Sequence, residues 1–232
     1  MSRLDVNRVV KTLGSRRGAS AVLRDVTFYV ADGECLGLKG STGSGKSTLL
    51  RIIAGLLAPD SGEVELDATL ISSPRIMLPP GSRKIGFVFQ NLGLWPHLTV
   101  NGHIEYALAG MGLARAARER LRAETLETFL LGGLEDRYPV ELSGGERHLL
   151  ALARAMCTDI RLLLLDEPFT GLDGALKERV LAMLRRERIR RNLTTLLVTH
   201  DDEEMRALCQ RVAHLNEGHI VEKTASERKR QF

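Results

Sequence analysis

Hydrophobic and polar residues follow two alternating patterns along the chain. Short, continuous apolar runs, typical of buried strands, occur at 35–39, 85–89, 161–166 and 195–199. Polar or glycine-rich residues follow each run, and three of the four runs lead into a segment with helical periodicity. Because strands that alternate with helices form parallel sheets, this pattern predicts an α/β fold with a mostly parallel sheet.

Two other kinds of segment complete the expected fold. From about 100 to 160 the chain contains no convincing strand, and apolar spacing predicts helices at 114–131 and 145–157. Four short segments have the pattern of antiparallel strands near a sheet edge: 26–30, 63–66, 212–215 and 220–222.

These elements predict a single domain over residues 1–232. Its α/β core would comprise about 1–90 and 161–232, and about 91–160 would form a helical subdomain inserted into that core. No internal repeat, sustained heptad pattern or low-complexity segment interrupts this division.

Composition favours an ordinary globular protein of the cytoplasm. Hydrophobic residues make up 44% of the chain and charged residues 27%. Cys35, Cys157 and Cys209 form no C-x-x-C pair, so we expect buried thiols in a reducing compartment rather than disulfides or a zinc site. The N-terminus lacks the apolar segment of a signal peptide, and no stretch approaches the roughly 18 apolar residues of a membrane span.

The net charge of +4 permits contact with nucleic acid or an anionic membrane but does not require it. The densest basic runs lie at 185–191 and 228–230. For the first, which lies in a helical pattern, we expect a solvated helix face. For the second, we expect a polar tail.

The segment GSTGSGKST matches the phosphate-binding pattern G-x-x-x-x-G-K-[ST] and lies between a predicted strand and a predicted helix. Glycines let the backbone wrap phosphates with its N–H groups, Lys46 can reach the β and γ phosphates, and the Ser47 hydroxyl can bind Mg²⁺. The predicted phosphate loop consists of Gly40, Ser41, Thr42, Gly43, Ser44, Gly45, Lys46, Ser47 and Thr48.

Polar side chains follow three of the predicted parallel strands. Four leucines lead directly into Asp166 and Glu167, and ligands bind in the crevice at the carboxyl ends of parallel strands. Asp166 could therefore hold Mg²⁺ through water, and Glu167 could polarise an attacking water. Gln90 and His200 end two other strands and Asp173 follows Glu167 closely, so we expect them to surround the γ-phosphate.

A second potential anion site lies about a hundred residues after the first. Ser143, Gly144 and Gly145 precede a long apolar-periodic run, and such a helix start offers unpaired N–H groups to an anion. A single nucleotide does not require two such sites.

The order of GSTGSGKST, FQ, LSGGE, LLLLDEP, LD and VTH resembles the nucleotide-binding subunit of ATP-binding cassette (ABC) transporters over about residues 22–222. The resemblance implies that the bound ligands are ATP and Mg²⁺. It also implies one role for each matching residue: Gln90 contacts Mg²⁺ or the attacking water, Asp166 associates with Mg²⁺, Glu167 is the general base, Asp173 communicates across a dimer and His200 contacts the γ-phosphate.

The same resemblance accounts for the second anion site. In this family the segment equivalent to Ser143, Gly144 and Gly145 binds the γ-phosphate of ATP held by a second subunit. Two copies would dock head to tail around two nucleotides, which favours a homodimer.

The segments YPVELSGGE, LWPHLTV and VTHDDEEMRAL resemble bacterial importer subunits that handle small polar solutes or oxyanions. This implies an ATPase that is peripheral on the inner face of the cell membrane and docks onto integral membrane transporter subunits. A solute-binding protein would be an indirect partner, and nucleic acid would not be one.

A docking surface is expected at 90–106. Trp95 is the only tryptophan and precedes a proline, and large aromatic side chains are enriched at interface hot spots. Leu92 and Leu94 extend this apolar segment, whereas Leu98 and Val100 are expected to pack in the core. In the resembling family, the neighbouring groove receives a short helix from the membrane subunit.

The family usually stacks an aromatic side chain on adenine, and by register that position falls near Arg17. An arginine plane can also stack on a base. The resemblance therefore leaves Arg17 as the candidate for contact with adenine.

Two other classes remain open. The first is an ABC-type ATPase that acts on nucleic acid or ribosomes, although the insert at 100–160 lacks the heptads of the coiled coils in repair members. The second is an ordinary phosphate-loop kinase or GTPase, against which LSGGE and His200 argue.

Overall fold

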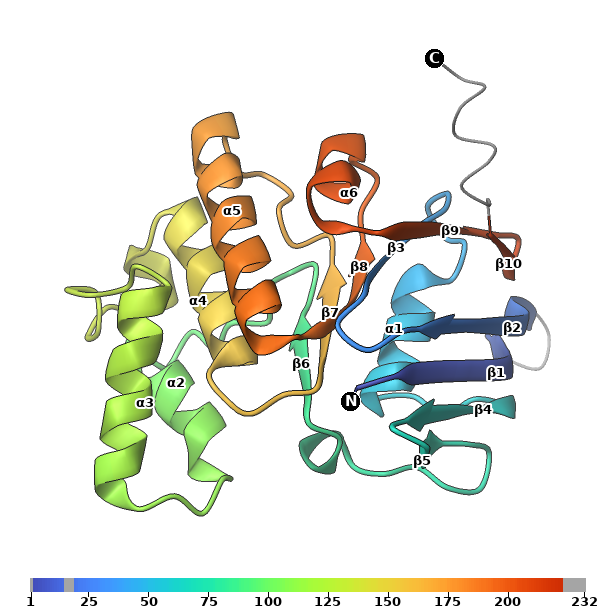
Figure 1. Cartoon of the computed structure of the whole chain (residues 1–232), viewed down its shortest axis with the longest axis horizontal. Coiled ribbons are helices and arrows are strands. Elements are labelled where there is room, and N and C mark those ends of the chain that lie inside the picture. The colour runs from blue at the N-terminus through green and yellow to red at the C-terminus, as the bar shows by residue number, and fades with distance from the viewer. Residues whose placement is uncertain (1, 15–18, 223–232) are drawn as a thin grey trace.

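The computed structural model describes residues 2–14 and 19–222. A six-stranded sheet with the strand order β10-β9-β3-β8-β7-β6 lies at the centre of these residues (Figure 1). Its strands are β3 (Cys35–Lys39), β6 (Ile85–Val88), β7 (Leu162–Asp166), β8 (Thr194–Val198), β9 (Arg211–Asn216) and β10 (His219–Glu222).

The four apolar runs form the parallel centre of this sheet, as predicted. β3 pairs in parallel with β8, β8 with β7, and β7 with β6. Every residue of β7 and β8 is buried, which explains why these strands are continuous apolar runs rather than alternating ones. The predicted edge strands 212–215 and 220–222 form the antiparallel pair of β9 and β10 at the edge of this sheet, and β9 also pairs in parallel with β3.

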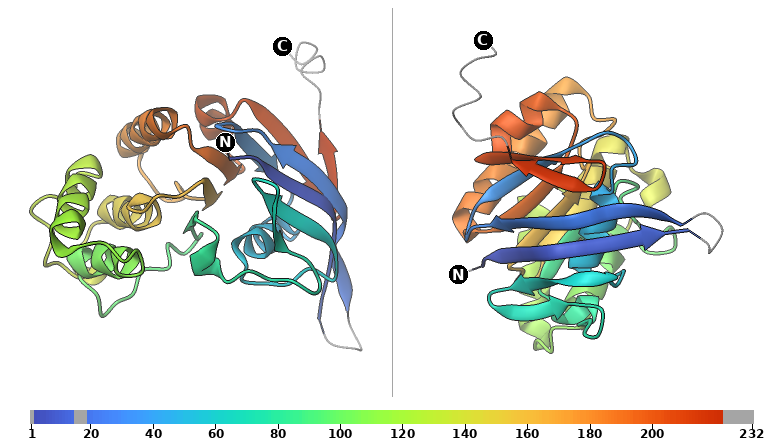
Figure 2. Two further views of the ribbon diagram at one scale, coloured as in Figure 1. Left: turned by 60° about the horizontal axis from the view of Figure 1, so that its bottom comes forward. Right: turned by 90° about the vertical axis from the view of Figure 1, so that its right-hand side faces the viewer.

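A second, four-stranded antiparallel sheet with the order β2-β1-β4-β5 holds the predicted strands 26–30 and 63–66. Its side chains and those of the parallel sheet enclose α1 (Lys46–Ala54) in one apolar core (Figure 2). The antiparallel part is thus more extensive than an edge. Its strands are β1 (Leu4–Leu13), β2 (Ser20–Val30), β4 (Ser61–Leu66) and β5 (Thr69–Ser72).

The sequence pattern did not reveal β1, and the structure gives the reason. Its pairing with β2 shifts register between Val6 and Val9, and Arg8 has a positive φ of 50°. This irregularity places Leu4, Val6 and Val9 in the core at spacings of two and then three residues. The period-two signal of a strand is lost at the irregularity.

Helices cover the other side of the parallel sheet (Figure 1). The expected helices at 114–131 and 145–157 are confirmed within a few residues, and residues 100–160 contain no strand. No helix in the described residues is both long enough and apolar enough to cross a bilayer. The helices besides α1 are α2 (Val100–Ala109), α3 (Arg115–Thr128), α4 (Gly144–Met156), α5 (Gly174–Arg191) and α6 (Asp202–Leu208), with short 3-10 turns at Pro80–Ser82 and Pro139–Glu141.

The basic run at 185–191 is not wholly a solvated face. Arg188 is buried and donates to Thr195 Oγ1 at 2.8 Å and to the Leu208 carbonyl at 3.2 Å. Glu187 is also buried, and it accepts from Arg190. The end of α5 packs over β8, so a buried arginine satisfies polar groups between these elements. The run at 228–230 lies outside the described residues.

The three cysteines are reduced, and two of them are adjacent in space. Cys35 Sγ lies 3.4 Å from Cys209 Sγ, although 174 positions separate them. The start of β3 meets the end of α6 there. Cys35 and Cys157 are buried as expected, whereas Cys209 is only half-buried, and burial raises the pKa of Cys157 to about 12.

Candidate functional site

The loop at 40–48 connects β3 to the start of α1. Gly45 precedes the helix with φ 103°, and none of the described side chains caps α1. A Cβ on Gly45 would lie 2.8 Å from both Leu23 Cδ2 and the Val22 carbonyl oxygen, so space as well as φ requires glycine. Lys46 Nζ donates to the carbonyls of Gly40 and Ser41, each at 2.9 Å. The loop therefore presents an uncapped helix start and a lysine held beside it, which suits an anion.

Asp166 lies at the end of β7 beside the first turn of α1. Burial raises the pKa of this carboxyl, and its hydrogen bond with Ser47 opposes that rise. A hydroxyl and a carboxylate thus meet next to Lys46, whose charge Asp166 also senses. The described residues contain no cluster of three His, Cys, Asp or Glu side chains that could hold a metal. This donor set fits Mg²⁺, which takes one or two protein ligands and completes its shell with phosphate and water oxygens.

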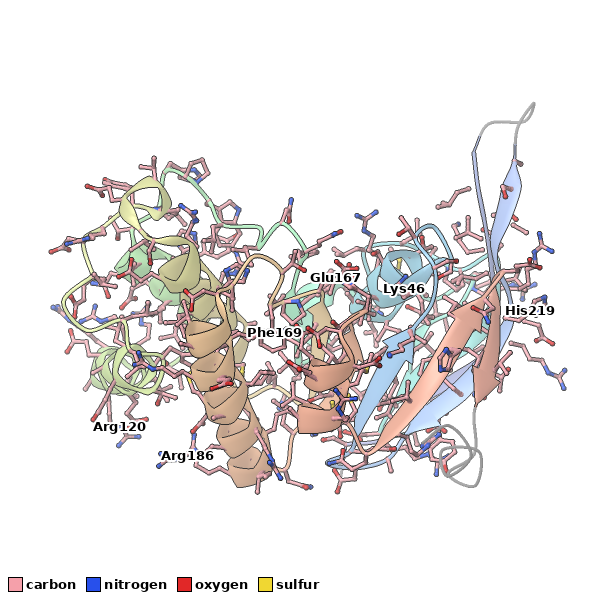
Figure 3. The ribbon with its side chains drawn as sticks, turned by 90° about the horizontal axis from the view of Figure 1, so that it is seen from above. Lys46, Arg120, Glu167, Phe169, Arg186 and His219 are labelled. Carbon is pink, nitrogen blue, oxygen red and sulfur yellow. The ribbon has the colours of Figure 1, made fainter. Side chains whose placement is uncertain are left out.

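Glu167 lies between two of the other predicted residues. Gln90 Nε2 donates to Glu167 Oε2 at 3.4 Å, and His200 Nδ1 lies 3.7 Å from Glu167 Oε1. The three residues follow the neighbouring strands β6, β7 and β8, so the sheet brings together side chains far apart in the sequence. Figure 3 shows Lys46 and Glu167 near each other in the middle of the molecule as seen from above.

Asp173 lies outside this cluster. It is the N-cap of α5, and its Oδ1 accepts from the Leu176 N–H at 2.9 Å. Its exposed position leaves its expected role across a dimer as a prediction.

The start of α4 differs from the open helix start expected there. Ser143 N–H donates to Glu146 Oε2 at 2.7 Å, and Glu146 N–H donates to Ser143 Oγ at 3.3 Å. The expectation of unpaired N–H groups is therefore wrong for Ser143 and Glu146, because S-x-x-E forms a capping box there. Hydrogen bonds from Ser143 lower the pKa of Glu146.

The two helix starts do not form one site within the chain. Leu162 and Leu164 of β7 pack in the core that contains α1, whereas Leu163 and Leu165 pack in the core that contains α4. Alternate residues of a strand point to opposite faces of its sheet, so α1 and α4 cover opposite faces. Ser143–Gly145 and the loop at 40–48 would therefore engage different ligands or different copies.

The expected contact of Arg17 with adenine falls outside the described residues. Tyr29 is an aromatic residue upstream of the loop. Its ring centre lies between two guanidinium groups, 4.8 Å from that of Arg3 and 4.6 Å from that of Arg211. Val22 contacts Gly45, and Tyr29 lies seven positions further along β2, a span of about 23 Å at about 3.3 Å per residue. Tyr29 is thus too far along β2 to cover a base at the loop.

A groove of about 1140 Å³ opens beside the segment that follows Gln90. Trp95 lines it, with its ring stacked on that of His103 at a centroid distance of 5.5 Å and tilted against that of Tyr106 at 4.8 Å. The Arg154 guanidinium lies 5.0 Å from the Trp95 ring centre. The groove is lined by Pro80, Gly81, Lys84, Ile85, Gly86, Phe87, Phe89, Gly93, Trp95, Tyr106, Ala107, Ala109, Gly110, Met111, Arg154, Ala155, Thr158, Asp159 and Ile160.

The other residues of this apolar segment divide differently from the prediction. Leu92 and Leu94 are partly buried and pack against the core that contains the buried side chains of α4. Val100 is fully buried as expected, and Leu98 is half-buried. Trp95 is therefore the main contribution of this segment to the groove.

Sequence reasoning missed two side chains that hold this segment. Arg154 donates to the carbonyls of Leu92 and Gly93. His103 is fully buried, accepts from the Trp95 N–H at 2.9 Å, and has a pKa lowered by burial. The sequence signal for such residues is an arginine or histidine on the apolar face of a predicted helix. A polar side chain that is buried there must find hydrogen-bond partners.

The parallel sheet, the loop after β3 and the acidic end of β7 define a P-loop nucleotide-binding protein. The sequence profile of the family described as ABC transporter matches residues 23–170. The chain belongs to this ABC transporter family.

Two curated relatives of this chain are both described as sulfate/thiosulfate import ATP-binding proteins. The chain is 41% identical over 221 residues to the sulfate/thiosulfate import ATP-binding protein CysA of Mycolicibacterium paratuberculosis, covering 94% of this chain and 59% of that protein. It is 37% identical over 214 residues to the probable sulfate/thiosulfate import ATP-binding protein CysA of Chlorella vulgaris, covering 92% of this chain and 89% of that protein. The chain thus spans little more than half the length of the first relative.

The solved dimeric structure of the bacterial ABC transporter cassette MJ0796 has the same fold, with a TM-score of 0.84 and 29% identity over 94% of this chain and 96% of that one. A second structure of that cassette, in a post-hydrolysis state with ADP and Pi, gives a TM-score of 0.82. The similarity extends over the α/β core and the helical segment together.

Proposed function

We propose that this chain is the ATP-binding and ATP-hydrolysing subunit of an ABC importer for a small polar solute or ion. The observation that carries the proposal is the contact of Glu167 with Gln90 and His200, beside Lys46 and Asp166. The names of both relatives support an oxyanion as the solute. We propose one ATP-binding domain over 1–232, with a core at about 1–90 and 161–232 and a helical subdomain at about 91–160.

In the proposed reaction, the loop at 40–48 binds the phosphates of ATP. Its backbone N–H groups and Lys46 Nζ meet negative oxygens, and the helix dipole of α1 favours the same charge. Ser47 and Asp166 would hold Mg²⁺, with Gln90 within reach of the same ion. When bound, the metal neutralises charge that develops on the phosphates.

Glu167 is the proposed general base. Its carboxylate takes a proton from water while the water oxygen bonds to the γ-phosphorus and the bond to the bridging oxygen breaks, giving ADP and phosphate. Gln90 holds one carboxylate oxygen, and His200 lies next to the other and close to where the γ-phosphate would sit. The geometry leaves Glu167 oriented before water arrives.

A second copy would complete the site. Ser143, Gly144 and Gly145 begin α4 on the face of the sheet opposite α1, so they would bind the γ-phosphate of ATP held by another subunit. Asp173, at the start of α5, would lie at the same contact. The dimeric neighbour MJ0796 supports this arrangement.

The groove that Trp95 lines is the proposed docking site for the integral membrane subunits. It is largely apolar and lies between the edge strand β6 and helices α2 and α4, which suits a short helix. The subunit would then be peripheral on the inner face of the membrane. A solute-binding protein would be reached only through those membrane subunits, and nucleic acid would not be a partner.

The experiment that tests the proposed reaction is the Glu167→Gln substitution. The amide can keep the contact with Gln90 but cannot accept a proton, so Mg²⁺-dependent turnover should fall by about 100-fold or more while ATP binding persists. Steady-state hydrolysis and nucleotide titration measure the two effects. Full hydrolysis by the variant would rule out Glu167 as the base.

The docking proposal is tested by copurification with Trp95→Ala. This variant should keep ATP hydrolysis by the isolated subunit and lose recovery with the membrane partner. Recovery of the wild-type chain with ribosomes or DNA would instead support an ATPase that acts on nucleic acid.

A further inference from the structure

The first turn of α5 contacts the segment that carries His200. We propose that Lys177 is a positioning residue, which holds this segment so that His200 stays next to Glu167. The inference rests on the proposed function, because it assigns Lys177 a part in the same reaction. Among the described residues, Lys177 makes no hydrogen bond or ion pair with the loop at 40–48, with Gln90 or with Glu167.

Lys177 binds two carboxylates at once. Its Nζ lies 2.8 Å from Glu204 Oε1 and also contacts Asp201 Oδ2. The Lys177 side chain is only 18% exposed, and that of Glu204 only 5%. A buried carboxylate without a cation is costly, so the lysine determines whether Glu204 can stay where it is.

These two carboxylates fix the chain on both sides of His200. Asp201 follows His200 directly, caps α6 through the N–H groups of Glu203 and Glu204, and donates its own N–H to Thr199 Oγ1 at 3.1 Å. Thr199, which precedes His200 directly, donates its hydroxyl to Glu204. Lys177 therefore closes a network that surrounds the histidine backbone.

His200 depends on this network because its own side chain is weakly held. That side chain is 75% exposed, and its Nδ1 lies 3.7 Å from Glu167 Oε1. An exposed imidazole keeps its direction only if its backbone is fixed. Misplacement of a reacting group by about 1 Å can cost about 100-fold in rate.

The residue before Lys177 adds a second connection. A Cβ on Gly145 would lie 1.9 Å from Leu176 Cδ2, so Leu176 packs directly onto the backbone at the start of α4. One turn of α5 thus contacts two segments. The first is the start of α4, which is proposed to bind the nucleotide of a partner, and the second is the segment that carries His200. A shift of α4 on docking would reach His200 through Leu176 and Lys177.

The test compares Lys177→Met with Arg179→Met, a matched loss of a cation from an exposed position on the same helix. Lys177→Met should lower kcat by about 10- to 100-fold with KM for ATP changed less than about twofold, because binding at 40–48 is untouched. Hydrogen–deuterium exchange should rise in 199–208 and stay unchanged in 46–54. Lys177→Arg should restore most of kcat, and Arg179→Met should match the wild type.

A double-mutant cycle with Glu204→Gln decides whether Lys177 acts through the carboxylates. The double variant should be no slower than Lys177→Met alone, because both changes break one network. Additive losses of kcat, or a Lys177→Met variant with wild-type kcat and exchange, would overturn the proposal. If the wild-type chain itself hydrolyses no ATP, the proposed function fails, and exchange in 199–208 still tests the positioning by Lys177.

Discussion

The starts of α1 and α4 are both glycine-rich helix N-termini, and they differ in what meets their N–H groups. At α1, Gly45 offers no side chain, and Lys46 places a cation beside the loop. At α4, Ser143 and Glu146 bind each other's N–H groups and place a carboxylate at the helix start. The first has no side-chain cap and carries a cation, whereas the second has a capping box and carries a carboxylate.

This difference shows that a helix N-terminus alone does not make an anion site. The dipole of α4 is already complemented by Glu146, so a phosphate arriving there would meet a like charge. The start of α1 carries the opposite charge and has no side-chain cap. We therefore expect ATP to bind first at α1 and to engage α4 only when two subunits dock.

The largest expected effect is on ATP binding, and it distinguishes the start of α1 from the start of α4. Lys46→Ala should weaken ATP binding to the single subunit by about 10- to 100-fold, because charge-assisted hydrogen bonds to the phosphates are lost. Ser143→Ala should leave that binding unchanged and reduce ATP-driven dimer formation. Nucleotide titration and light scattering in the Glu167→Gln background measure both. Equal loss of monomer binding in the two variants would mean that both starts serve one nucleotide within the chain.

A smaller effect concerns the glycines. Gly145→Ala should lower the free energy of unfolding by about 1–3 kcal/mol, because its Cβ would collide with Leu176. Gly43→Ala should cost about 1 kcal/mol, since φ is 81° but no heavy atom lies within 4 Å of the added Cβ. Urea unfolding of the two variants gives the comparison. A milder effect at Gly145 than at Gly43 would show that α5 moves aside easily.

The smallest effect concerns Glu146. Glu146→Gln removes the like charge and keeps an acceptor for Ser143 N–H, so ATP-driven association should strengthen a few-fold. The free energy of unfolding should fall by about 0.3–1 kcal/mol at neutral pH, because the carboxylate no longer complements the helix dipole. Weaker association of the variant would show that the carboxylate helps to bind the partner.

The stability difference between the wild type and Glu146→Gln should depend on pH, because the pKa of Glu146 is lowered in the folded protein. A depressed folded-state pKa stabilises the fold above the unfolded value of about 4.3, and this contribution is lost as pH falls through the folded value. The stability difference between wild type and Glu146→Gln should stay constant from about pH 7 to 5 and shrink below about pH 4. Urea unfolding across that range measures the difference.

The parts of the fold that sequence could predict are those with a local pattern. The apolar runs of β3, β7 and β8 and the loop at 40–48 each carry their signal in a few adjacent residues. The cluster of Gln90, Glu167 and His200 was predictable because the carboxyl ends of parallel strands meet at one edge.

The parts that sequence could not predict depend on contacts between distant segments. Lys177 finds its two carboxylates only once α5 and α6 are packed. Arg154 supports the Trp95 segment only because α4 lies beneath it. The capping box at Ser143 is different, because its S-x-x-E pattern lies within four adjacent residues and can be predicted from the sequence.

The backbone of Glu167 has a cost that the rest of the chain must carry. Its φ is 49°, in the left-handed region that glycine or asparagine adopts more readily, and its N–H bond to the Val198 carbonyl at 2.9 Å anchors it in the sheet. Such a conformation costs about 1–3 kcal/mol for an ordinary residue. Selection for stability alone would favour glycine at position 167. A glutamate there lowers the free energy of unfolding but fixes the direction of one carboxylate, and the four buried leucines of β7 supply stability that makes this loss tolerable.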